Sequence, residues 1–264
     1  MAESSTVTIH LSTLKSGTSV QQLDLDEVLA KGVPHGWVHP PVDLDRDMLT
    51  KHDWDLFLLT DNEQLPAPIQ AYVETKIDLA SEQYDALQAK KDLIPKPSDR
   101  TPPLAQEFRE GRIPNSAVVD DRNDSGPGTL RLTRAMTELL TAALPTPIAN
   151  KPVSLFNLFK YKDSRAVHDA YMEGFKQKFG DAAGASVQFM GPVRTYLEQT
   201  DERGTKRKQL RGTNWEDANL VQYDTIWHYV YMLSTDIYAE LNKQKVAGLD
   251  DTCILVVSEI ELCK

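Results

Sequence analysis

The sequence predicts an α+β protein built on antiparallel sheets. Three observations predict it: a strand-like alternation of apolar and polar residues near the N-terminus, a continuous apolar run at 54–61 bounded by charges, and strands and helices in the order βαββαβ after residue 152. The chain has 264 residues, of which 41% are hydrophobic and 26% charged. This composition is typical of a globular chain with one large or two small domains.

The first 95 residues contain the signals of a small mixed domain. Residues 6–14, TVTIHLSTL, alternate between an apolar face and a polar face, as a half-buried strand does. Residues 24–30 are expected to form a short helix, and the following HGWVHPPVDLD at 35–45 is rich in turn residues. Residues 54–61, WDLFLLTD, predict a buried strand, and 81–93 a helix. No clear last strand follows in this half.

Residues 96–150 are expected to connect this half to the next. Proline, aspartate, serine and arginine dominate the first part, up to Gly128, and large apolar side chains are few. Such a segment buries too little apolar surface to order itself, so we interpret it as an extended connection. Residues 130–144, LRLTRAMTELLTAAL, carry a helical apolar face that ends at the prolines Pro145 and Pro147.

The second half, 151–264, has the clearest pattern. Strands are expected at 153–162, 186–194, 219–223 and 253–262, and helices at 165–179 and 225–247, the latter with a break near 234–236. The order βαββαβ is that of a ferredoxin-like split βαβ unit, in which both helices cover one face of a four-stranded antiparallel sheet. The charged segment 195–214 between the middle strands is expected to form a long hairpin insertion.

Several runs of this half resemble a known superfamily. They are FNLFKYKD, a helix containing Tyr171, VQFMGPV, a tryptophan leading into LVQYDTIWHYVYMLSTDIY, and GLDDTCILVVSEIEL. Together they resemble the dimeric α+β-barrel superfamily, and within it a small ferredoxin-like domain family of unknown function. Asp224-Thr225 stands where that family usually has Pro-Ser. The resemblance covers Val153 to Leu262.

The resemblance implies that two such sheets face each other and form a barrel. Because residues 1–95 are similar in order to a degenerate ferredoxin-like half, we expect two tandem copies that close a barrel within one chain. For activity, the resemblance implies oxygenation, cyclisation, dehydration or isomerisation without a cofactor, carried out by a few polar groups in an apolar cavity.

Charge and cysteine content restrict the partners. The formal net charge of −10 disfavours a nucleic-acid or anionic membrane partner, and the basic run KRKQLR at 206–211 has acidic neighbours, which favours a solvated hairpin. Neither a signal peptide nor an apolar run of membrane-spanning length is indicated, so the cytosol is the expected compartment. Cys253 and Cys263 are too far apart in one extended strand to form a disulfide. Metal-binding, dinucleotide-binding and P-loop motifs are absent from the sequence.

The candidate catalytic residues are two histidines and a glutamate. His168 lies at the edge of a predicted helical stripe, as general base or exposed flank residue. His228 lies in an aromatic-rich helix that suits a cavity for a flat apolar ligand, although aromatic stripes at helical spacing more often belong to a core. Glu259 would have a raised pKa if it pointed into an apolar barrel, and would be solvated at a sheet edge.

Further residues are candidates for substrate binding. Asn157 places an amide in an apolar strand, on the face it shares with Tyr161, where it either binds a ligand carbonyl or hydroxyl or bonds the backbone of a neighbouring strand or loop. Arg194 could receive a substrate carboxylate or pair with Glu259. The remaining candidates are His10, Tyr171, Phe189, Trp215, Tyr223, Trp227 and Tyr231.

Three functions follow as hypotheses. The first is a cofactor-independent enzyme that acts on a small hydrophobic molecule, aromatic or polyketide-like, in the barrel. The second is a protein that holds a ligand without turnover, with haem bound through His168 or His228 as one variant. The third is a structural dimerisation module. No cofactor and no metal are expected in the first case, and a homodimer is compatible with all three.

Overall fold

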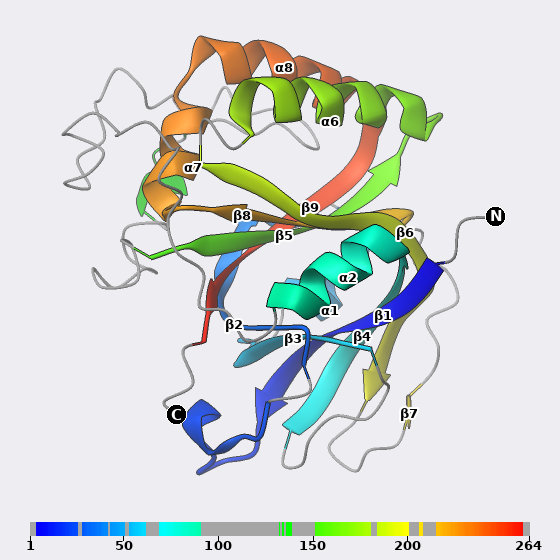
Figure 1. Ribbon diagram of the computed structural model, residues 1–264, viewed down its shortest axis with the longest axis vertical. Helices are drawn as coiled ribbons and strands as arrows, with labels where there is room; N and C mark the ends of the chain where they lie inside the picture. The colour runs from blue at the N-terminus through cyan, green and yellow to red at the C-terminus, as the bar shows by residue number, and fades with distance from the viewer. Residues whose placement is uncertain are drawn as a thin grey trace.

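Eight strands of the chain close into one antiparallel barrel (Figure 1). The computed structural model describes residues 4–25, 28–41, 43–50, 53–61, 69–90, 132, 134, 136–138, 151–180, 184–200, 206–207 and 215–260. The strands of the first half are β1 (Ser4–Leu14), β2 (Ala30–His39), β3 (Leu56–Thr60) and β4 (Ile69–Ala80). Those of the second half are β5 (Val153–Tyr161), β6 (Ala185–Thr200), β8 (Asp217–Tyr223) and β9 (Leu249–Glu259).

The strand order around the barrel is β4-β1-β3-β2-β9-β5-β8-β6, and β6 pairs back to β4. Each half contributes its strands in the same spatial order, namely its fourth, first, third and second along the chain. Two seams therefore join the halves, β2 with β9 and β4 with β6, and both are antiparallel. The barrel is closed by strands of a single chain, as the sequence led us to expect.

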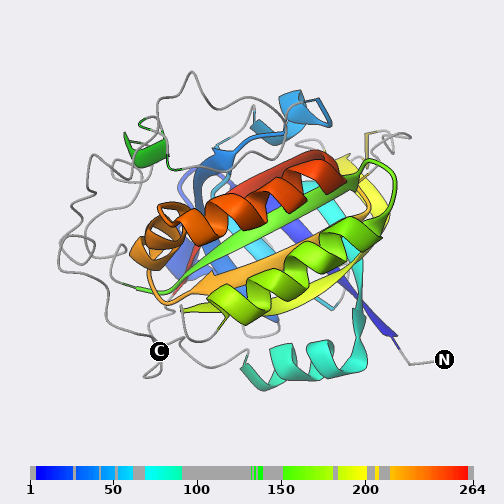
Figure 2. The same ribbon diagram turned by 90° about the horizontal axis from the view of Figure 1, so that it is seen from above.

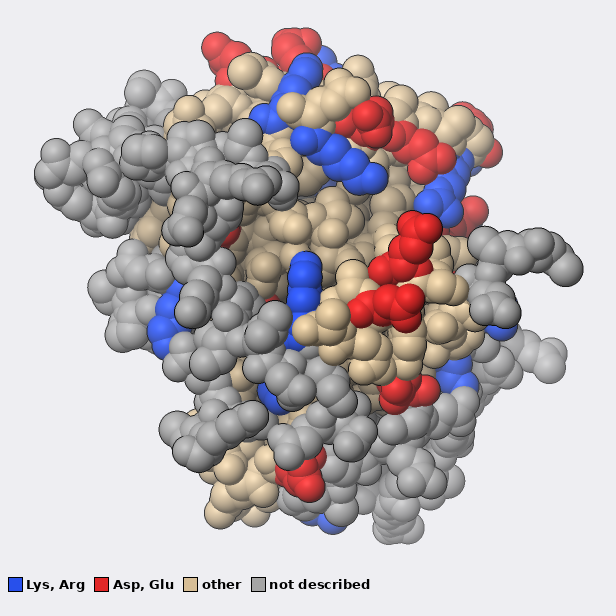
Figure 3. All heavy atoms as spheres, viewed as in Figure 1, with Lys and Arg blue, Asp and Glu red and all other residues tan. Residues whose placement is uncertain are grey.

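The helices cover one side of the barrel. Helices α6 (Arg165–Phe179), α7 (Ile226–Leu233) and α8 (Asp236–Gly248) lie over the outer face of the second half, where α6 and α8 run side by side (Figure 2). The shorter elements are the 3-10 helix η1 (Val20–Gln22) and the helices α1 (Arg46–Thr50) and α2 (Ser81–Lys90). Acidic and basic side chains are interspersed around α6 and α8 on the surface (Figure 3). Exposed ion pairs such as Lys243–Glu240 on α8 contribute little to stability.

Apolar side chains pack the barrel interior. In β1 they are Val7, Ile9 and Leu11, which meet Phe156 and Leu158 of β5 in one cluster. β5 is apolar on both faces because its outer face also packs, through Leu155, against the helices. The alternation of the sequence therefore separates a barrel core from a helix–sheet core.

Two sequence expectations for the first half are corrected. None of the described residues of the expected helix at 24–30 is helical, because Leu23, Leu25 and Val28 instead lie against Leu56 and Leu58 on the outer face of β3. The turn-rich segment at 35–45 begins within β2, a strand whose register shifts twice and which holds Gly36 at a φ of 131°. Glycine tolerates this conformation. A bulged strand loses the regular alternation of apolar and polar residues by which strands are predicted from sequence.

The last strand of the first half, which the sequence did not reveal, is β4. Its apolar residues Val73, Ile77 and Leu79 point into the barrel core, and polar residues separate them. β4 pairs with β1 and β6 and so closes the barrel. A clear strand is therefore present where none was expected.

Other expectations fall partly outside the described residues. Arg134 and residues 136–138 are helical, and Leu132 and Met136 pack into the helix–sheet core. The remainder of the predicted helix at 130–144 and most of the predicted connection lie outside the described residues. The hairpin at 195–214 is described at two pairs, Gln199 with Arg207 and Thr200 with Lys206 of β7 (Lys206–Arg207). The division into domains remains a prediction. Cys253 is a free, buried thiol, and Cys263 lies outside the description.

Candidate functional site

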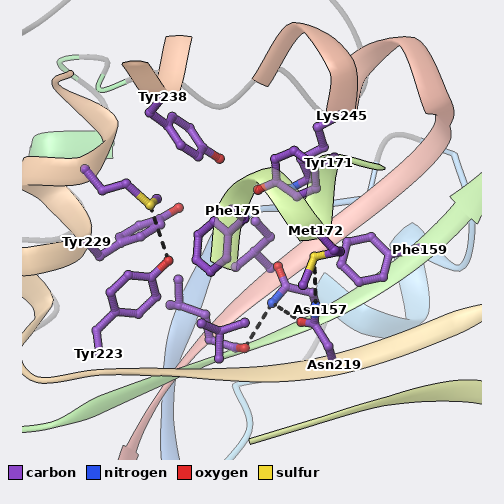
Figure 4. A pocket seen from close by; sticks show the side chains of 14 residues that line it. Asn157, Phe159, Tyr171, Met172, Phe175, Asn219, Tyr223, Tyr229, Tyr238 and Lys245 are labelled. Atoms are coloured by element: carbon purple, nitrogen blue, oxygen red, sulfur yellow. Dashed lines mark hydrogen bonds between the residues drawn. The ribbon is translucent and has the colours of Figure 1, made fainter. Parts of the chain in front are cut away.

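A cavity lies between the sheet of the second half and its three covering helices, outside the barrel (Figure 4). The enclosed part of the cavity measures about 30 Å³, and about 380 Å³ is free of atoms when the open solvent at its mouth is included. Small-molecule sites usually have volumes of roughly 300 Å³ or more. A small ligand would therefore occupy the mouth as well as the enclosed part.

The floor of the cavity comes from outward-facing residues of neighbouring strands. Asn157 of β5 is paired in register with Asn219 of β8 on one side and with Ile254 of β9 on the other. Leu155 of β5 and Val221 of β8, which also pair in register, are the next residues of these strands on the same face and continue the floor. Because alternate residues of a strand share a face, the sequence places two amides side by side in an apolar floor.

The two floor amides bind each other. Asn157 Nδ2 donates to Asn219 Oδ1 at 2.8 Å and to the backbone oxygen of Leu155 at 3.0 Å. Asn219 Nδ2 lies 4.0 Å from the sulfur of Met172 in α6. The donor hydrogens of Asn157 are thus used within the protein, by a side chain of β8 and by the backbone of its own strand rather than by the backbone of a neighbouring strand or loop.

The roof consists of helix side chains at helical spacing. α6 contributes Tyr171, Met172 and Phe175, and α7 contributes Tyr229 and Met232. On α8 the buried stripe runs through Tyr238, Leu241, Asn242 and Lys245, of which Tyr238 and Lys245 line the cavity.

Four tyrosines surround the cavity, and their hydroxyls point toward its middle (Figure 4). They are Tyr171, Tyr223, Tyr229 and Tyr238. Burial raises the pKa of all four, to about 12 for Tyr171. The hydroxyls consequently stay protonated and can donate hydrogen bonds at any ordinary pH.

Tyr229 has a free hydroxyl at this site. Its side chain is 1% exposed, and its oxygen has no hydrogen-bond partner within the described structure. By contrast, the hydroxyl of Tyr223 lies 3.6 Å from the sulfur of Met232. A buried hydroxyl without a partner is costly, so this atom marks a position that a ligand oxygen would satisfy.

Lys245 places an amine in the same apolar surroundings. The residue is 2% exposed, and its Nζ lies 5.8 Å from the ring centre of Phe159 and 5.9 Å from that of Tyr171. No carboxylate among the described residues forms an ion pair with it. Burial lowers the pKa of Lys245 to about 7, so a large share of the amine is neutral near neutral pH.

A buried polar cluster adjoins the amine. Asp217, 1% exposed, accepts a short hydrogen bond from the Tyr161 hydroxyl and lies 3.2 Å from Arg165 of α6. Tyr161 Oη also lies 3.3 Å from His168 Nδ1. This cluster connects the partly exposed Arg165 to the fully buried His168.

His168 is packed among aromatic rings. The ring centres of Phe159, Tyr161 and Tyr171 lie 4.3, 5.3 and 5.7 Å from that of His168. Burial, with the charges of Lys245 and Arg165, lowers its pKa to about 3, and its Nε2 has no described partner. His168 is therefore a neutral imidazole, one ring away from the cavity.

The structure brings some of the sequence candidates together. Asn157, Tyr171 and Tyr223 line the cavity, and His168 and Tyr161 lie in the adjoining cluster.

Three further candidates lie on α7. Trp227 is buried in the same helix–sheet core, and Tyr231 of the same helix is exposed. His228 is half-buried, with its Nδ1 2.9 Å from Thr225 Oγ1.

Other candidates lie elsewhere. Phe189 and Trp215 belong to the barrel core, and Arg194 pairs with Asp78 at the barrel surface. Glu259 is an exposed residue at the end of β9, where partial desolvation raises its pKa to about 7 and Gln222 donates to it at 2.7 Å.

His10 faces outward from the first half, on the opposite side of the sheet from the barrel core. Its Nε2 lies 2.9 Å from Thr60 Oγ1, and its Nδ1 lies 3.5 Å from Glu74. This arrangement involves no residue of the cavity.

Sequence reasoning missed Lys245, Asn219, Tyr238 and Asp217. The signal for Lys245 was present, because it follows Tyr238 by seven residues and so continues the buried stripe of α8. A lysine on such a stripe is unusual, since its charge is costly to bury. Asn219 could be recognised as part of the site only from its pairing with Asn157 across the two strands.

The described residues contain neither a cluster suited to a metal ion nor a helix suited to cross a membrane. No group of three or more histidine, cysteine, aspartate or glutamate side chains is arranged there to hold a metal ion. None of the described helices has the length and apolar character needed to cross a membrane.

Fold and site together define an α+β protein with a closed eight-stranded antiparallel barrel and a tyrosine-lined cavity under its helices. No protein-family model matches the chain, and no curated protein matches it. Two solved structures match, both of the RPA0582 protein of unknown function from Rhodopseudomonas palustris. The first is 16% identical with a TM-score of 0.38 and covers 52% of this chain and 99% of its own. The methylated form has the same identity and TM-score, covering 53% and 98%.

Proposed function

We propose that this chain is a cofactor-independent enzyme that binds a small hydrophobic molecule, aromatic or polyketide-like, in the cavity under the helices and transfers protons on it. The observation that carries the proposal is the buried amine of Lys245, which pairs with no carboxylate of the described residues and lies beside four protonated tyrosine hydroxyls. Cyclisation, dehydration and isomerisation are reactions of this type. Oxygenation remains an alternative for which no residue of the site argues specifically.

The chemistry follows from the two kinds of group. A neutral amine can remove a proton from a carbon next to a carbonyl group, and its lowered pKa keeps much of it neutral near pH 7. Negative charge then develops on the carbonyl oxygen. Hydroxyls that donate to this oxygen, above all the unpartnered Tyr229, would stabilise the charge in a site with little water.

The fold is compatible with the proposed superfamily. In each half the spatial strand order is fourth, first, third, second, which is the order of a ferredoxin-like sheet, and the second half adds its helices on one face. We accordingly propose two tandem ferredoxin-like copies, of which the first contains, in its described residues, only the short helices η1, α1 and α2. The cavity lies within the second copy, whereas the barrel interior is packed with apolar side chains.

Proton exchange on a simple ketone tests the proposal. Acetophenone, which is small and aromatic, would be incubated with the protein in D2O, and loss of its methyl proton signal followed by NMR. We expect the wild type to accelerate exchange and Lys245→Met to lower the rate by about 10²-fold or more. Lys243→Met, on the exposed side of the same helix, is the matched control and should exchange like the wild type. Exchange by wild type no faster than by Lys245→Met would refute the proposal.

A ligand-binding protein without turnover is the second candidate. The free hydroxyl of Tyr229 favours it, because this group needs an acceptor but no catalytic base. Saturation-transfer NMR that detects bound acetophenone, together with no acceleration of exchange, would support this candidate over the enzyme.

Haem is a weaker variant of that candidate. The aromatic rings around His168 occupy the space next to its imidazole, and Thr225 contacts His228, so these residues do not fit a porphyrin in this arrangement. A Soret band in the purified protein would reinstate it. The dimerisation module and the homodimer remain predictions that sedimentation can test.

A further inference from the structure

The amine of Lys245 is buried against two aromatic rings and has no carboxylate partner among the described residues. Structural buried lysines normally pair with a carboxylate, since an isolated buried ammonium is costly. The contacts described for Lys245 Nζ are instead with the faces of two aromatic rings, and the residue is 2% exposed. A desolvated lysine of this kind is the type that adds to carbonyl compounds.

The charged groups around the amine agree with this role. His39 of β2 and His168 of α6 both interact electrostatically with Lys245, and burial is the main cause that lowers both of their pKa values. Arg165 lies beyond His168, and Asp217 is bound to Arg165 and Tyr161. Asp251 acts on His39 and accepts from the backbone nitrogens of Asp43 and Leu44. The carboxylates of Asp217 and Asp251 are thus bound to groups other than Lys245.

We infer that Lys245 forms a covalent imine with a small, predominantly apolar aldehyde or ketone held in the tyrosine-lined cavity. The inference rests on the proposed function, because it names the substrate class and the bonding step at the same site. The amine nitrogen attacks the carbonyl carbon, and a carbinolamine forms. The carbon–oxygen bond then breaks, and the oxygen leaves as water with the two hydrogens that the nitrogen has lost.

The tyrosines suit both ends of this step. An incoming carbonyl oxygen can accept from the free hydroxyl of Tyr229, which polarises the carbon for attack. Departure of the carbinolamine oxygen needs a proton. The protonated hydroxyls of Tyr171 and Tyr238, which influence each other's pKa, are donors in the same cavity. In the net reaction one amine and one carbonyl group give one imine and one water molecule, and neither an oxidant nor a reductant is needed.

Reductive trapping tests the inference. Benzaldehyde and sodium cyanoborohydride would be added to the intact protein near neutral pH, and modified lysines quantified by peptide mapping with mass spectrometry. We expect a benzyl group on Lys245 at close to one per protein. Lys243 of the same helix is exposed and paired with Glu240, and we expect at least tenfold less modification there. Labelling of Lys245 no faster than of Lys243 would overturn the inference.

Two variants and a second ligand keep the outcomes distinct. In Lys245→Met, whose fold is checked by circular dichroism, the specific adduct should be lost, whereas Lys243→Met should keep it. Tyr229→Phe should slow trapping several-fold while leaving the adduct on Lys245. Binding of benzoate detected by saturation-transfer NMR, without any aldehyde adduct on Lys245, would overturn the imine in favour of a carboxylate ligand.

Failure of the imine and failure of the proposed function are distinguishable. If acetophenone exchange depends on Lys245 but no adduct is trapped, the amine acts only as a base and the inference alone fails. If neither exchange nor trapping depends on Lys245, both fail. If trapping succeeds without exchange, the imine stands and the proton-transfer function fails.

Discussion

Asn157 and Asn219 hold each other across β5 and β8, with Nδ2 of the first donating to Oδ1 of the second at 2.8 Å. Both are almost completely buried on the floor of the cavity. The pair explains why a strand that is apolar on both faces carries an amide. It is also a polar boundary of the candidate site, so its energetics bear on the fold and on the site together.

The amide pair should show measurable coupling. Asn157→Leu leaves Asn219 Oδ1 without its donor in a buried position, and we expect it to lower the free energy of unfolding by about 1–3 kcal/mol. Asn219→Leu should likewise leave the Asn157 amide without its acceptor, and the double variant, which removes both partners, should lose less than the sum of the two single changes. Urea unfolding of the wild type, the two single variants and the double variant measures this coupling. Strict additivity would show that the hydrogen bond contributes nothing.

The two barrel seams each depend on a glycine. A Cβ on Gly191 of β6 would lie 1.9 Å from the backbone oxygen of Asp78 in β4, and one on Gly32 of β2 would lie 2.8 Å from that of Ser258 in β9. We expect Gly191→Ala and Gly32→Ala each to lower the free energy of unfolding by about 1–3 kcal/mol or more. Thermal unfolding followed by circular dichroism is the measurement.

Gly174→Ala in α6 is the control for the seam variants. Its nearest obstacle is the flexible end of Leu241, and alanine favours helix, so the change should be close to neutral. Equal destabilisation by Gly174→Ala and Gly191→Ala would contradict the importance of the seams.

Lys245 should make the protein more stable in mild alkali than at pH 7. Burial lowers the folded pKa to about 7 from 10.5, so between these values the unfolded chain binds more protons and the free energy of unfolding rises with pH. Lys245→Met should flatten this rise and increase stability near pH 7 by roughly 1–4 kcal/mol. Urea unfolding at about pH 7 and about pH 9.5 measures it, with Lys243→Met as control. An unchanged slope in Lys245→Met would mean that the amine stays charged in the folded protein.

His168 should contribute to acid sensitivity. Because burial, Lys245 and Arg165 lower its folded pKa from 6.5 to about 3, the unfolded chain binds more protons below pH 6.5. The contribution of the neutral imidazole to stability is therefore present above pH 6.5 and is lost as the pH falls toward 3. His168→Phe should reduce the loss of stability between about pH 6.5 and about pH 4.

The comparison for His168 is His228, whose pKa burial also lowers but which is only half-buried. His228→Gln should change the acid dependence less than His168→Phe does. If the two variants have the same acid dependence as the wild type, neither imidazole is held neutral by the fold.

Much of the second half could be predicted because its patterns are local. Strand β5 and helices α6 and α8 follow from apolar runs and helical stripes, and the stripe of α6 predicted the burial of Tyr171. In the first half, β2 escaped prediction because two register shifts interrupt its alternation. Strand β4 was missed although buried and partly exposed residues alternate regularly from Val73 to Leu79, which is the same pattern that predicted β1.

Only part of the site could be found in this way. Asn157 stood out as a single odd amide, but its partner Asn219 is 62 residues away, and no local pattern joins them. Lys245 was one lysine among several in a helix. Only the packing of α6 and α8 over the sheet places its amine against the rings of Phe159 and Tyr171, away from the described carboxylates.

The sequence by itself determined the elements of the second half, the two apolar faces of β5 and the stripes of α6 and α8, because each depends on the period of side chains along one segment. Tertiary structure alone decided that the barrel closes on itself and fills its interior. It also decided that the cavity lies under the helices, where four tyrosines and one amine meet. The physical reason is that burial, pairing and pKa depend on neighbours from distant segments, and these exist only once the chain has folded.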